Sequence, residues 1–221
     1  MKANDLQSGR GDSGRRVAND LAQPKTLLNR SNGRVCPQAY SASPLRRFVM
    51  DESGALESRL DYLEARIEIG DLVAAYGRAV DDRDWQSLGG LYCKEATFDA
   101  VEGPTTGRDQ IVEYYEKRTS MFGVTYHYPH SVEVTEVDGE SGTGVVCAHA
   151  ELAIGGRTFW VALRYFDSYK REDGRWRFAE RRVKQLYAME LSELPDGMDS
   201  LLRKRWPGTE PAPADWGPGS G

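Results

Sequence analysis

The spacing of the apolar residues changes once along the chain, from a helical to an alternating period, and this change constrains the fold more than any other feature. From residue 56 to residue 80, apolar side chains recur mostly every three or four positions, which predicts one long amphipathic helix, or two helices if Gly70 and Asp71 interrupt it. A short second helix is predicted over 85–92 and a third over 108–122, with a strand and a turn between them. Helices therefore dominate the first half of the predicted domain.

After residue 130, polar and apolar residues alternate, as they do along strands that have one face in a core. Turns of the Asp-Gly and Gly-Gly type divide this half into four long strands. The predicted strands lie within 130–140, 142–156, 157–176 and 175–190. Helices followed by a strand meander predict an α+β fold with a strongly curved antiparallel sheet. A sheet curved around a helix leaves an internal pocket at its open end, where a small molecule can bind.

Composition divides the chain into three parts. Residues 1–49 are rich in Gly, Ser, Asn and Arg, and they carry nine Lys or Arg against three acidic residues. This pattern predicts a disordered basic extension, and a basic interaction arm is the alternative. A folded domain is predicted over 50–205, and the Pro- and Gly-rich stretch 206–221 is predicted to be a flexible tail.

Charge, hydropathy and cysteine content argue against several functional classes. The net charge of −5 gives no basic surface suited to nucleic acid or to an anionic membrane. No stretch of about 18 apolar residues predicts a membrane span. The three cysteines form no CxxC pair, which is typical of the reducing cytoplasm. We therefore expect a cytoplasmic protein that binds neither nucleic acid nor membrane.

All three histidines of the chain, His127, His130 and His149, lie in one short window. Within the second predicted strand, His149 and Glu151 share one face, while the opposite face is wholly apolar and predicts core. The His149 face either lines a pocket or meets solvent. The local sequence leaves open which of His127 and His130 points inward, because both flank Pro129 at the start of the alternation.

Two chemistries compete for this window. The histidines and Glu151 could bind zinc or iron, but their spacing matches no strong ligand pattern, so we predict no metal. The alternative is acid–base chemistry, in which a carboxylate orients a neutral imidazole. Asp81 is the best candidate partner, because an acid at the end of a helix opposes the helix dipole and needs another reason to be there. Capping of the next helix is the competing explanation, although Asp82 or Asp84 could do this.

Three stretches of the chain resemble a known group of domains. They are LEARIEIGDLVAAYGRAVDDRDWQSLGGLY, YHYPHSVEV and the terminal DGRWRFAERRV. Together they resemble the SnoaL-like group of the nuclear transport factor 2-like superfamily, over about residues 55–190. The resemblance implies a cone-shaped, curved sheet closed by helices around an internal pocket. Within this superfamily, the chain resembles bile-acid 7-alpha-dehydratase, scytalone dehydratase and hexachlorocyclohexane dehydrochlorinase, whose shared pocket holds a His–Asp dyad.

This resemblance implies roles for individual residues. The dyad aspartate falls on Asp81 and the dyad histidine on His127. A tyrosine of the dehydratases falls on Tyr76, and an arginine of the dehydrochlorinase falls on Arg181. His130 has a near-equivalent in the HxxH stretch of the bile-acid enzyme, so it stays an alternative base.

A polar position on the middle strand of the dehydratases falls near Ala150, between His149 and Glu151. A shift of one residue would bring either of them into the pocket. His130, His149, Glu151 and Arg181 are therefore predicted to bind substrate, and His127, Asp81 and Tyr76 are predicted to be catalytic.

The resemblance implies a cofactor-free lyase, a dehydratase-type enzyme that acts on a small, largely apolar cyclic molecule. His127 would remove a proton from carbon, Asp81 would orient it, and Tyr76 would donate a hydrogen bond to a developing negative charge. The alternatives are an isomerase of the ketosteroid-isomerase type, a polyketide cyclase, or a non-catalytic ligand-binding dimer. A homo-oligomer, dimer or trimer, is expected because the stretch RTFWVALRYF carries large apolar residues on both faces.

Overall fold

A computed structural model of the protein describes residues 52–217. The predicted basic extension, 1–49, lies outside the described residues. All elements named below lie within residues 52–217.

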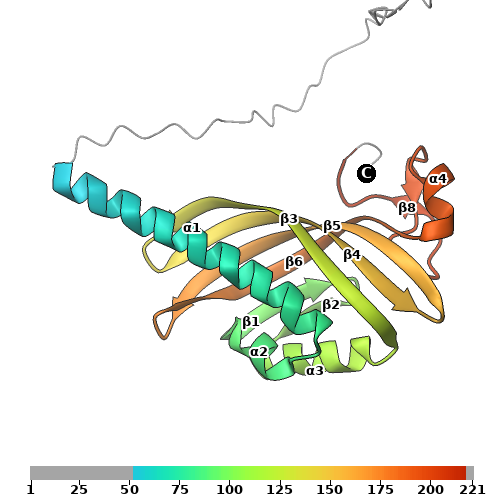
Figure 1. Ribbon diagram of the computed structural model, residues 1–221, viewed down its shortest axis with the longest axis horizontal. Helices are drawn as coiled ribbons and strands as arrows, with labels where there is room; N and C mark the ends of the chain where they lie inside the picture. Colours follow the sequence, from blue (N-terminus) through green and yellow to red (C-terminus); the bar gives the residue numbers. More distant parts are fainter. Residues whose placement is uncertain (1–51, 218–221) are drawn as a thin grey trace, which may run out of the picture. The chain divides into compact units, whose positions relative to one another are not determined.

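The long first helix, α1 (Glu52–Asp81), differs in burial between its two halves. Its N-terminal half extends beyond the sheet (Figure 1), and its apolar side chains Leu56, Leu60, Leu63 and Ile67 are exposed. In the C-terminal half the apolar side chains are buried against the sheet, and they are Ile69, Val73, Tyr76 and Val80. The second half therefore fixes where the helix ends relative to the strands.

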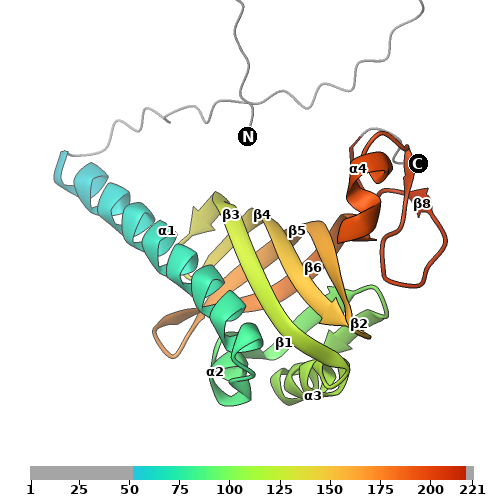
Figure 2. The same ribbon diagram turned by 45° about the vertical axis from the view of Figure 1, so that its right-hand side comes forward.

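A six-stranded curved sheet forms the main layer of the domain (Figure 2). Its order is β2 (Gly103–Thr106), β1 (Tyr92–Ala100), β6 (Arg175–Glu190), β5 (Arg157–Glu172), β4 (Ser141–Ile154) and β3 (Phe122–Asp138). The strands from β3 to β6 form an antiparallel meander, while β1 joins β6 in parallel. The predicted α+β class with a curved antiparallel sheet is confirmed.

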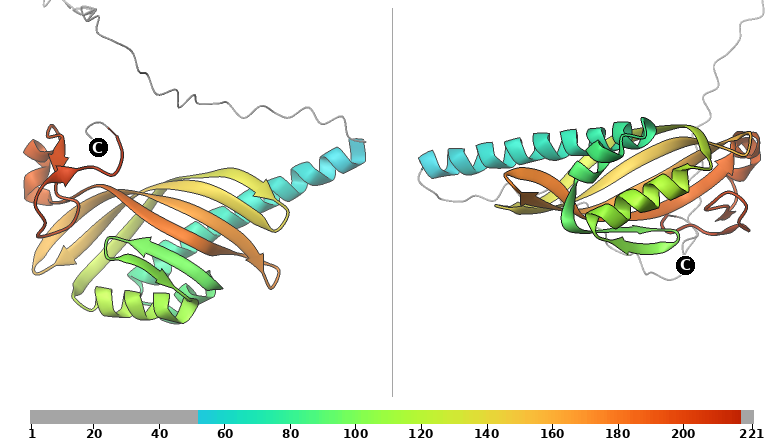
Figure 3. Two further views of the ribbon diagram at one scale, coloured as in Figure 1. Left: turned by 180° about the vertical axis from the view of Figure 1, so that it is seen from behind. Right: turned by 90° about the horizontal axis from the view of Figure 1, so that it is seen from below.

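Two shorter helices lie near the end of α1 (Figure 3). They are α2 (Trp85–Gly90) and α3 (Arg108–Thr119). The side chain of Asp84 caps α2 by accepting a hydrogen bond of 3.0 Å from the backbone N–H of Ser87. Because Asp84 performs this function, Asp81 is free for another one.

Strand β3 begins at Phe122 rather than at residue 130, so His127 lies inside the strand. Its backbone pairs with Ala150 of β4, whose side chain is buried in the core. The pairing register shifts between Pro129 and Ser131, which is the signature of a β-bulge. His127 consequently shares the concave, core-facing side with Ala150, whereas Tyr128 pairs with His149 on the other side.

The chain after β6 forms small elements: η1 (Leu191–Glu193), α4 (Leu194–Gly197), and a two-stranded sheet of β7 (Leu202–Arg203) and β8 (Ala212–Pro213). The described part of the predicted flexible tail makes specific contacts with the main sheet. The carboxylate of Asp215 accepts a hydrogen bond of 2.8 Å from the backbone N–H of Gln185, and the guanidinium carbon of Arg164 lies 3.7 Å from the ring centroid of Trp216. Up to residue 217, this segment therefore packs onto β5 and β6.

Candidate active site

His127 and Asp81 meet where the end of α1 packs against β3. The Nδ1 atom of His127 lies 2.7 Å from Oδ1 of Asp81. The backbone N–H of His127 also donates to Oδ2 of the same carboxylate, at 2.8 Å. Both side chains are nearly buried, with 13% and 11% exposed, so water weakens this contact little. The two residues predicted as a dyad are thus brought together.

Two further residues hold the carboxylate in place. The hydroxyl of Thr125 donates to Oδ1 of Asp81 at 2.9 Å. Arg83 in turn donates to the Thr125 hydroxyl at 2.9 Å, to the backbone oxygen of Val80 at 2.6 Å and to that of Gly123 at 2.9 Å. The backbone of Arg83 has a φ of 59°, in the left-handed region that residues other than glycine rarely adopt. Arg83 therefore joins the C-terminus of α1 to the start of β3, and so to the dyad.

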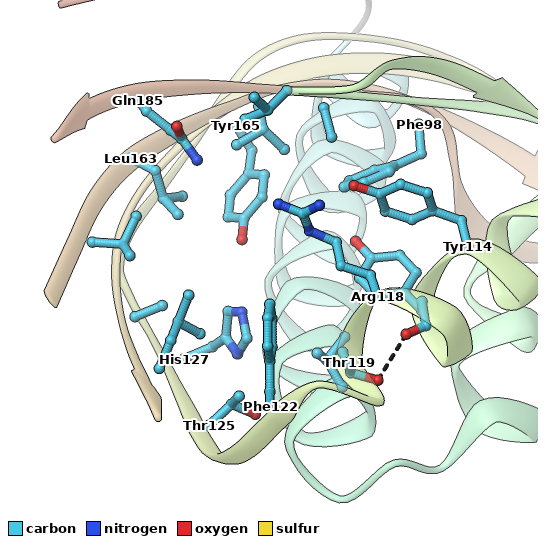
Figure 4. Close-up of a pocket in the computed structure, with 18 of the residues that line it drawn as sticks. Phe98, Tyr114, Arg118, Thr119, Phe122, Thr125, His127, Leu163, Tyr165 and Gln185 are labelled. Atoms are coloured by element: carbon cyan, nitrogen blue, oxygen red, sulfur yellow. Dashed lines mark hydrogen bonds between the residues drawn. The ribbon is translucent and has the colours of Figure 1, made fainter. Parts of the chain in front are cut away.

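The partner on Nδ1 determines which nitrogen of His127 is available for chemistry. A carboxylate only accepts hydrogen bonds, so Nδ1 carries the proton and Nε2 carries the free lone pair. The ring lines an internal cavity, and Figure 4 shows it directed into the same space as the hydroxyl of Tyr165 and the guanidinium of Arg118. The arrangement can accept a proton at Nε2 from a bound molecule, while Asp81 balances the charge that results.

The cavity has a volume of about 90 Å³ and lies between α1, α3 and the concave side of the sheet. Apolar side chains form most of its wall: Val80, Phe98, Phe122, Ala150, Leu152, Val161, Leu163 and Val183. Such a lining favours a small, largely apolar ligand.

Four tyrosines, Tyr76, Tyr114, Tyr115 and Tyr165, supply hydroxyl groups to this wall. The hydroxyls of Tyr76 and Tyr115 are hydrogen-bonded at 2.7 Å, and the ring centroid of Tyr76 lies 6.1 Å from that of His127. Burial raises the pKa of all four phenols, that of Tyr114 to about 12. They therefore keep their protons at neutral pH and act as hydrogen-bond donors. Tyr76, predicted to be catalytic, lies in the same cavity as His127.

Arg181, predicted to bind substrate, lies below the wall of the cavity and does not line it. Its side chain is completely buried and forms two hydrogen bonds with Asp167, at 2.9 and 2.7 Å. Its guanidinium carbon lies 4.2 Å from the ring centroid of Tyr76 and 4.1 Å from that of Tyr165. Burial alone lowers the pKa of Arg181, but the carboxylate of Asp167 outweighs it and the pKa is raised. Arg181 therefore supports two pocket tyrosines from behind instead of contacting a ligand.

His130, His149 and Glu151 were also predicted to bind substrate, and the structure places them on the opposite, convex side of the sheet. None of them lines the cavity. Nε2 of His130 lies 2.6 Å from Nδ1 of His149, and the hydroxyl of Tyr128 donates to Glu151 at 3.1 Å. The reason is alternation: Ala150 faces the core, so its neighbours on either side face outward. His127, not His130, is therefore the histidine of the pocket.

Several residues of the site were not predicted from the sequence. Thr125 and Arg83 hold the carboxylate, Arg118 and Tyr165 reach into the cavity, and Trp206 lines it. A helical period would have placed Arg118 next to Tyr114 and Tyr115, and this was the one available signal. Trp206 comes from the segment expected to be a tail, so no local pattern could have found it.

Among residues 52–217, no group of three or more His, Cys, Asp or Glu side chains is placed to hold a metal ion. Of the described helices, none is long and apolar enough to cross a membrane.

Comparisons with known proteins agree with this architecture. Residues 61–182 match the family described as the SnoaL-like domain. Gamma-hexachlorocyclohexane dehydrochlorinase of Sphingobium indicum is 30% identical over 129 residues, which cover 56% of this chain and 82% of that protein.

Solved structures with the same fold include two from Novosphingobium aromaticivorans. One, named as a scytalone dehydratase, is 19% identical with a TM-score of 0.55, covering 60% of this chain and 91% of that one. The other, described as NTF2-like with a cystatin-like fold, is 26% identical with a TM-score of 0.53, covering 62% and 92%. The predicted nuclear transport factor 2-like fold is thus confirmed.

Proposed function

The chain belongs to the SnoaL-like domain family, and from this premise we propose that it is a cofactor-free lyase that eliminates a small leaving group from a largely apolar cyclic molecule. Its similarity to a dehydrochlorinase supports a lyase-type enzyme. The observation that carries the proposal is the 2.7 Å contact between Nδ1 of His127 and Asp81 at the wall of an apolar cavity.

In the proposed reaction, Nε2 of His127 accepts a proton from a ring carbon. The electron pair of that C–H bond forms the new C=C bond, and the leaving group on the adjacent carbon departs with its own bonding electrons. A halide leaves as the anion, and the imidazolium then gives its proton to water, whereas a hydroxyl takes up the proton that Nε2 of His127 has accepted and leaves as water. Asp81 balances the charge of the imidazolium that forms.

The tyrosine hydroxyls have a complementary role in this proposal. A protonated phenol can donate a hydrogen bond to the oxygen or halogen on which negative charge develops, and such a donor stabilises the transition state more than the ground state. Tyr165 reaches into the cavity that His127 lines. Tyr76 lines the same cavity, and its hydroxyl is hydrogen-bonded to that of Tyr115. Either Tyr76 or Tyr165 can therefore donate a hydrogen bond to the leaving group.

The proposal can be tested with single-ring substrates that carry a chloride or a hydroxyl next to an acidic C–H bond, including gamma-hexachlorocyclohexane. Product formation is followed by mass spectrometry and by release of chloride. His127→Gln should lower the rate by at least about 10³-fold. His130→Gln is the matched control, because it removes an imidazole from the convex side, and it should keep the rate. A His127→Gln variant that retains the wild-type rate would overturn the proposal.

A further inference from the structure

One cation reaches into the cavity, and the proposed elimination does not use it. Arg118 lies in the last turn of α3, and its side chain is 18% exposed. Figure 4 shows its guanidinium in the space between Tyr114, Tyr165 and His127. A charge surrounded by an apolar wall is unfavourable unless it is paired. Its position therefore needs an explanation in terms of a partner.

The protein pairs Arg118 on its outer side only. Glu102, in the turn between β1 and β2, forms an ion pair with Nη1, and the Tyr114 hydroxyl fixes Glu102 by donating to it at 2.6 Å. The guanidinium carbon lies 4.1 Å from the ring centroid of Trp206, which covers one face. Within residues 52–217, no carboxylate or carbonyl oxygen accepts a hydrogen bond from Nε or Nη2 of Arg118. One edge of the guanidinium is thus held and the other is available to a ligand.

We propose that Arg118 is a specificity-determining residue that binds a carboxylate of the substrate, so that the lyase acts on a single-ring acid. This inference rests on the proposed function for the reaction, although the binding site itself does not depend on turnover. A guanidinium presents parallel N–H groups that match the two oxygens of a carboxylate. Burial lowers the pKa of Arg118, and an anion bound at its open edge would oppose this shift by favouring the charged form.

The geometry also indicates how such an acid would lie. Its ring would occupy the apolar part of the cavity, against Leu163 and Val161, with its carboxylate toward α3. His127 comes from the opposite wall, on β3, so the imidazole and the guanidinium would contact different parts of one ligand. Arg118 would therefore orient the ring and expose one C–H bond to the base.

The test is a comparison of two probes of the same shape, benzoate and benzamide, by isothermal titration calorimetry on the full chain. Benzoate should bind at least about 10-fold more tightly than benzamide, because its charge is paired in a poorly hydrated site. Arg118→Met should reduce this preference to less than about 2-fold. Arg157→Met is the matched control: Arg157 also forms an ion pair, with Glu190, but it is exposed and does not line the cavity.

Glu102→Gln gives an independent test should Arg118→Met fold poorly. It removes the negative charge that competes with a ligand for Arg118, so it should strengthen benzoate binding and leave benzamide binding unchanged. Equal affinity for the two probes in the wild type, no benzoate binding at millimolar concentration, or an undiminished preference in Arg118→Met would overturn the inference. Weaker benzoate binding by Glu102→Gln would overturn it as well.

His127→Gln separates this inference from the proposed function. The variant lacks the base, so it should lose turnover and still prefer benzoate over benzamide. If the wild type shows the preference but eliminates nothing, the reaction is wrong and the anion site stands. If it eliminates neutral rings and shows no preference, the reaction stands and the role of Arg118 is wrong.

Discussion

The two sides of strands β3 and β4 each hold histidine, and they differ in what the imidazole is bonded to. On the concave side, Nδ1 of His127 meets a carboxylate, and the other nitrogen faces an apolar cavity. On the convex side, Nδ1 of His149 meets a second imidazole, that of His130, and Nε2 lies 3.4 Å from the hydroxyl of Tyr187. The residue type is the same, and only the partner and the surroundings distinguish the two sites.

This comparison shows what a histidine needs in order to act as a base. A carboxylate partner stabilises the charged imidazole, whereas an imidazole partner competes with it for a proton. The pKa of His149 is accordingly lowered, by burial and by the charge of His130. On the concave side, His127 can accept a proton during a reaction because Asp81 offsets the positive charge. On the convex side, the imidazole of His130 cannot offset a positive charge on His149.

The largest effect, on the rate of elimination, should follow from removing the carboxylate of Asp81, which is the feature that distinguishes the concave site. Asp81→Asn keeps the shape of the side chain but offers an amide to Nδ1, so His127 loses its fixed tautomer and its charge partner. The rate of elimination should fall by about 10³- to 10⁴-fold, with little change in the affinity for substrate. Steady-state kinetics with the substrate found in the screen measure both quantities.

Asp82→Asn is the control for this change, because it removes the neighbouring acid, which is exposed. A nitrogen-detected NMR spectrum of the imidazoles adds a direct observation. In the wild type, His127 should show the Nδ1-protonated tautomer alone, and in Asp81→Asn a mixture. An unchanged spectrum together with an unchanged rate would mean that Asp81 is only structural.

The next largest effect, on stability, should come from the buried ion pair between Arg181 and Asp167 beneath the concave side. Asp167→Asn leaves the buried guanidinium of Arg181 without its counter-charge, so the free energy of unfolding should fall by about 3–5 kcal/mol. On the periphery, Arg157→Met breaks an exposed pair with Glu190 and should cost less than about 1 kcal/mol. Urea unfolding measures both. Equal losses would show that burial does not distinguish these two pairs.

The fold could be predicted well because the features that indicate it, the apolar period and the turn residues, are local in the sequence. The change of period gave the helices before the strands, and Asp-Gly and Gly-Gly turns gave the boundaries of the meander. The start of β3 was placed too late, because Pro129 and the irregular spacing around it hide the strand that contains His127. The oligomeric state stays a prediction.

The candidate site was only partly predictable, for a physical reason. Asp81 and His127 could be paired through resemblance, and the structure places them together. The faces of His149 and Glu151 could not be assigned, because an alternating strand shows which residues share a face but not which face meets the cavity. Arg118 and Trp206 come together only through tertiary packing, so neither stood out in the sequence.

A smaller effect on the concave site should come from Arg83, which contacts the Asp81 carboxylate through Thr125 and donates weakly, at 3.5 Å, to the backbone oxygen of Asp81. Arg83→Met removes its hydrogen bonds to the Thr125 hydroxyl and to the backbone oxygens of Val80, Asp81 and Gly123. We expect a loss of about 1–3 kcal/mol in the free energy of unfolding and a fall of about 10-fold in rate. If Arg83 acts by positioning Asp81, the same change should lower the rate no further in the Asp81→Asn background. Arg78→Met, on the exposed side of α1, is the control.

The smallest effect should come from the convex side, and it should depend on pH. Because the pKa of His149 is lowered in the folded state, the unfolded chain binds a proton more readily there. His149 therefore contributes stability above its ordinary pKa of 6.5, and this contribution declines as the pH falls below 6.5 towards the lower pKa of the folded state. The group is partly exposed, so the change should stay below about 1 kcal/mol. Urea unfolding of His149→Gln should show a flatter pH dependence in this range than the wild type, while a steeper one would mean that the convex pair is stabilised by protonation and resembles the concave site after all.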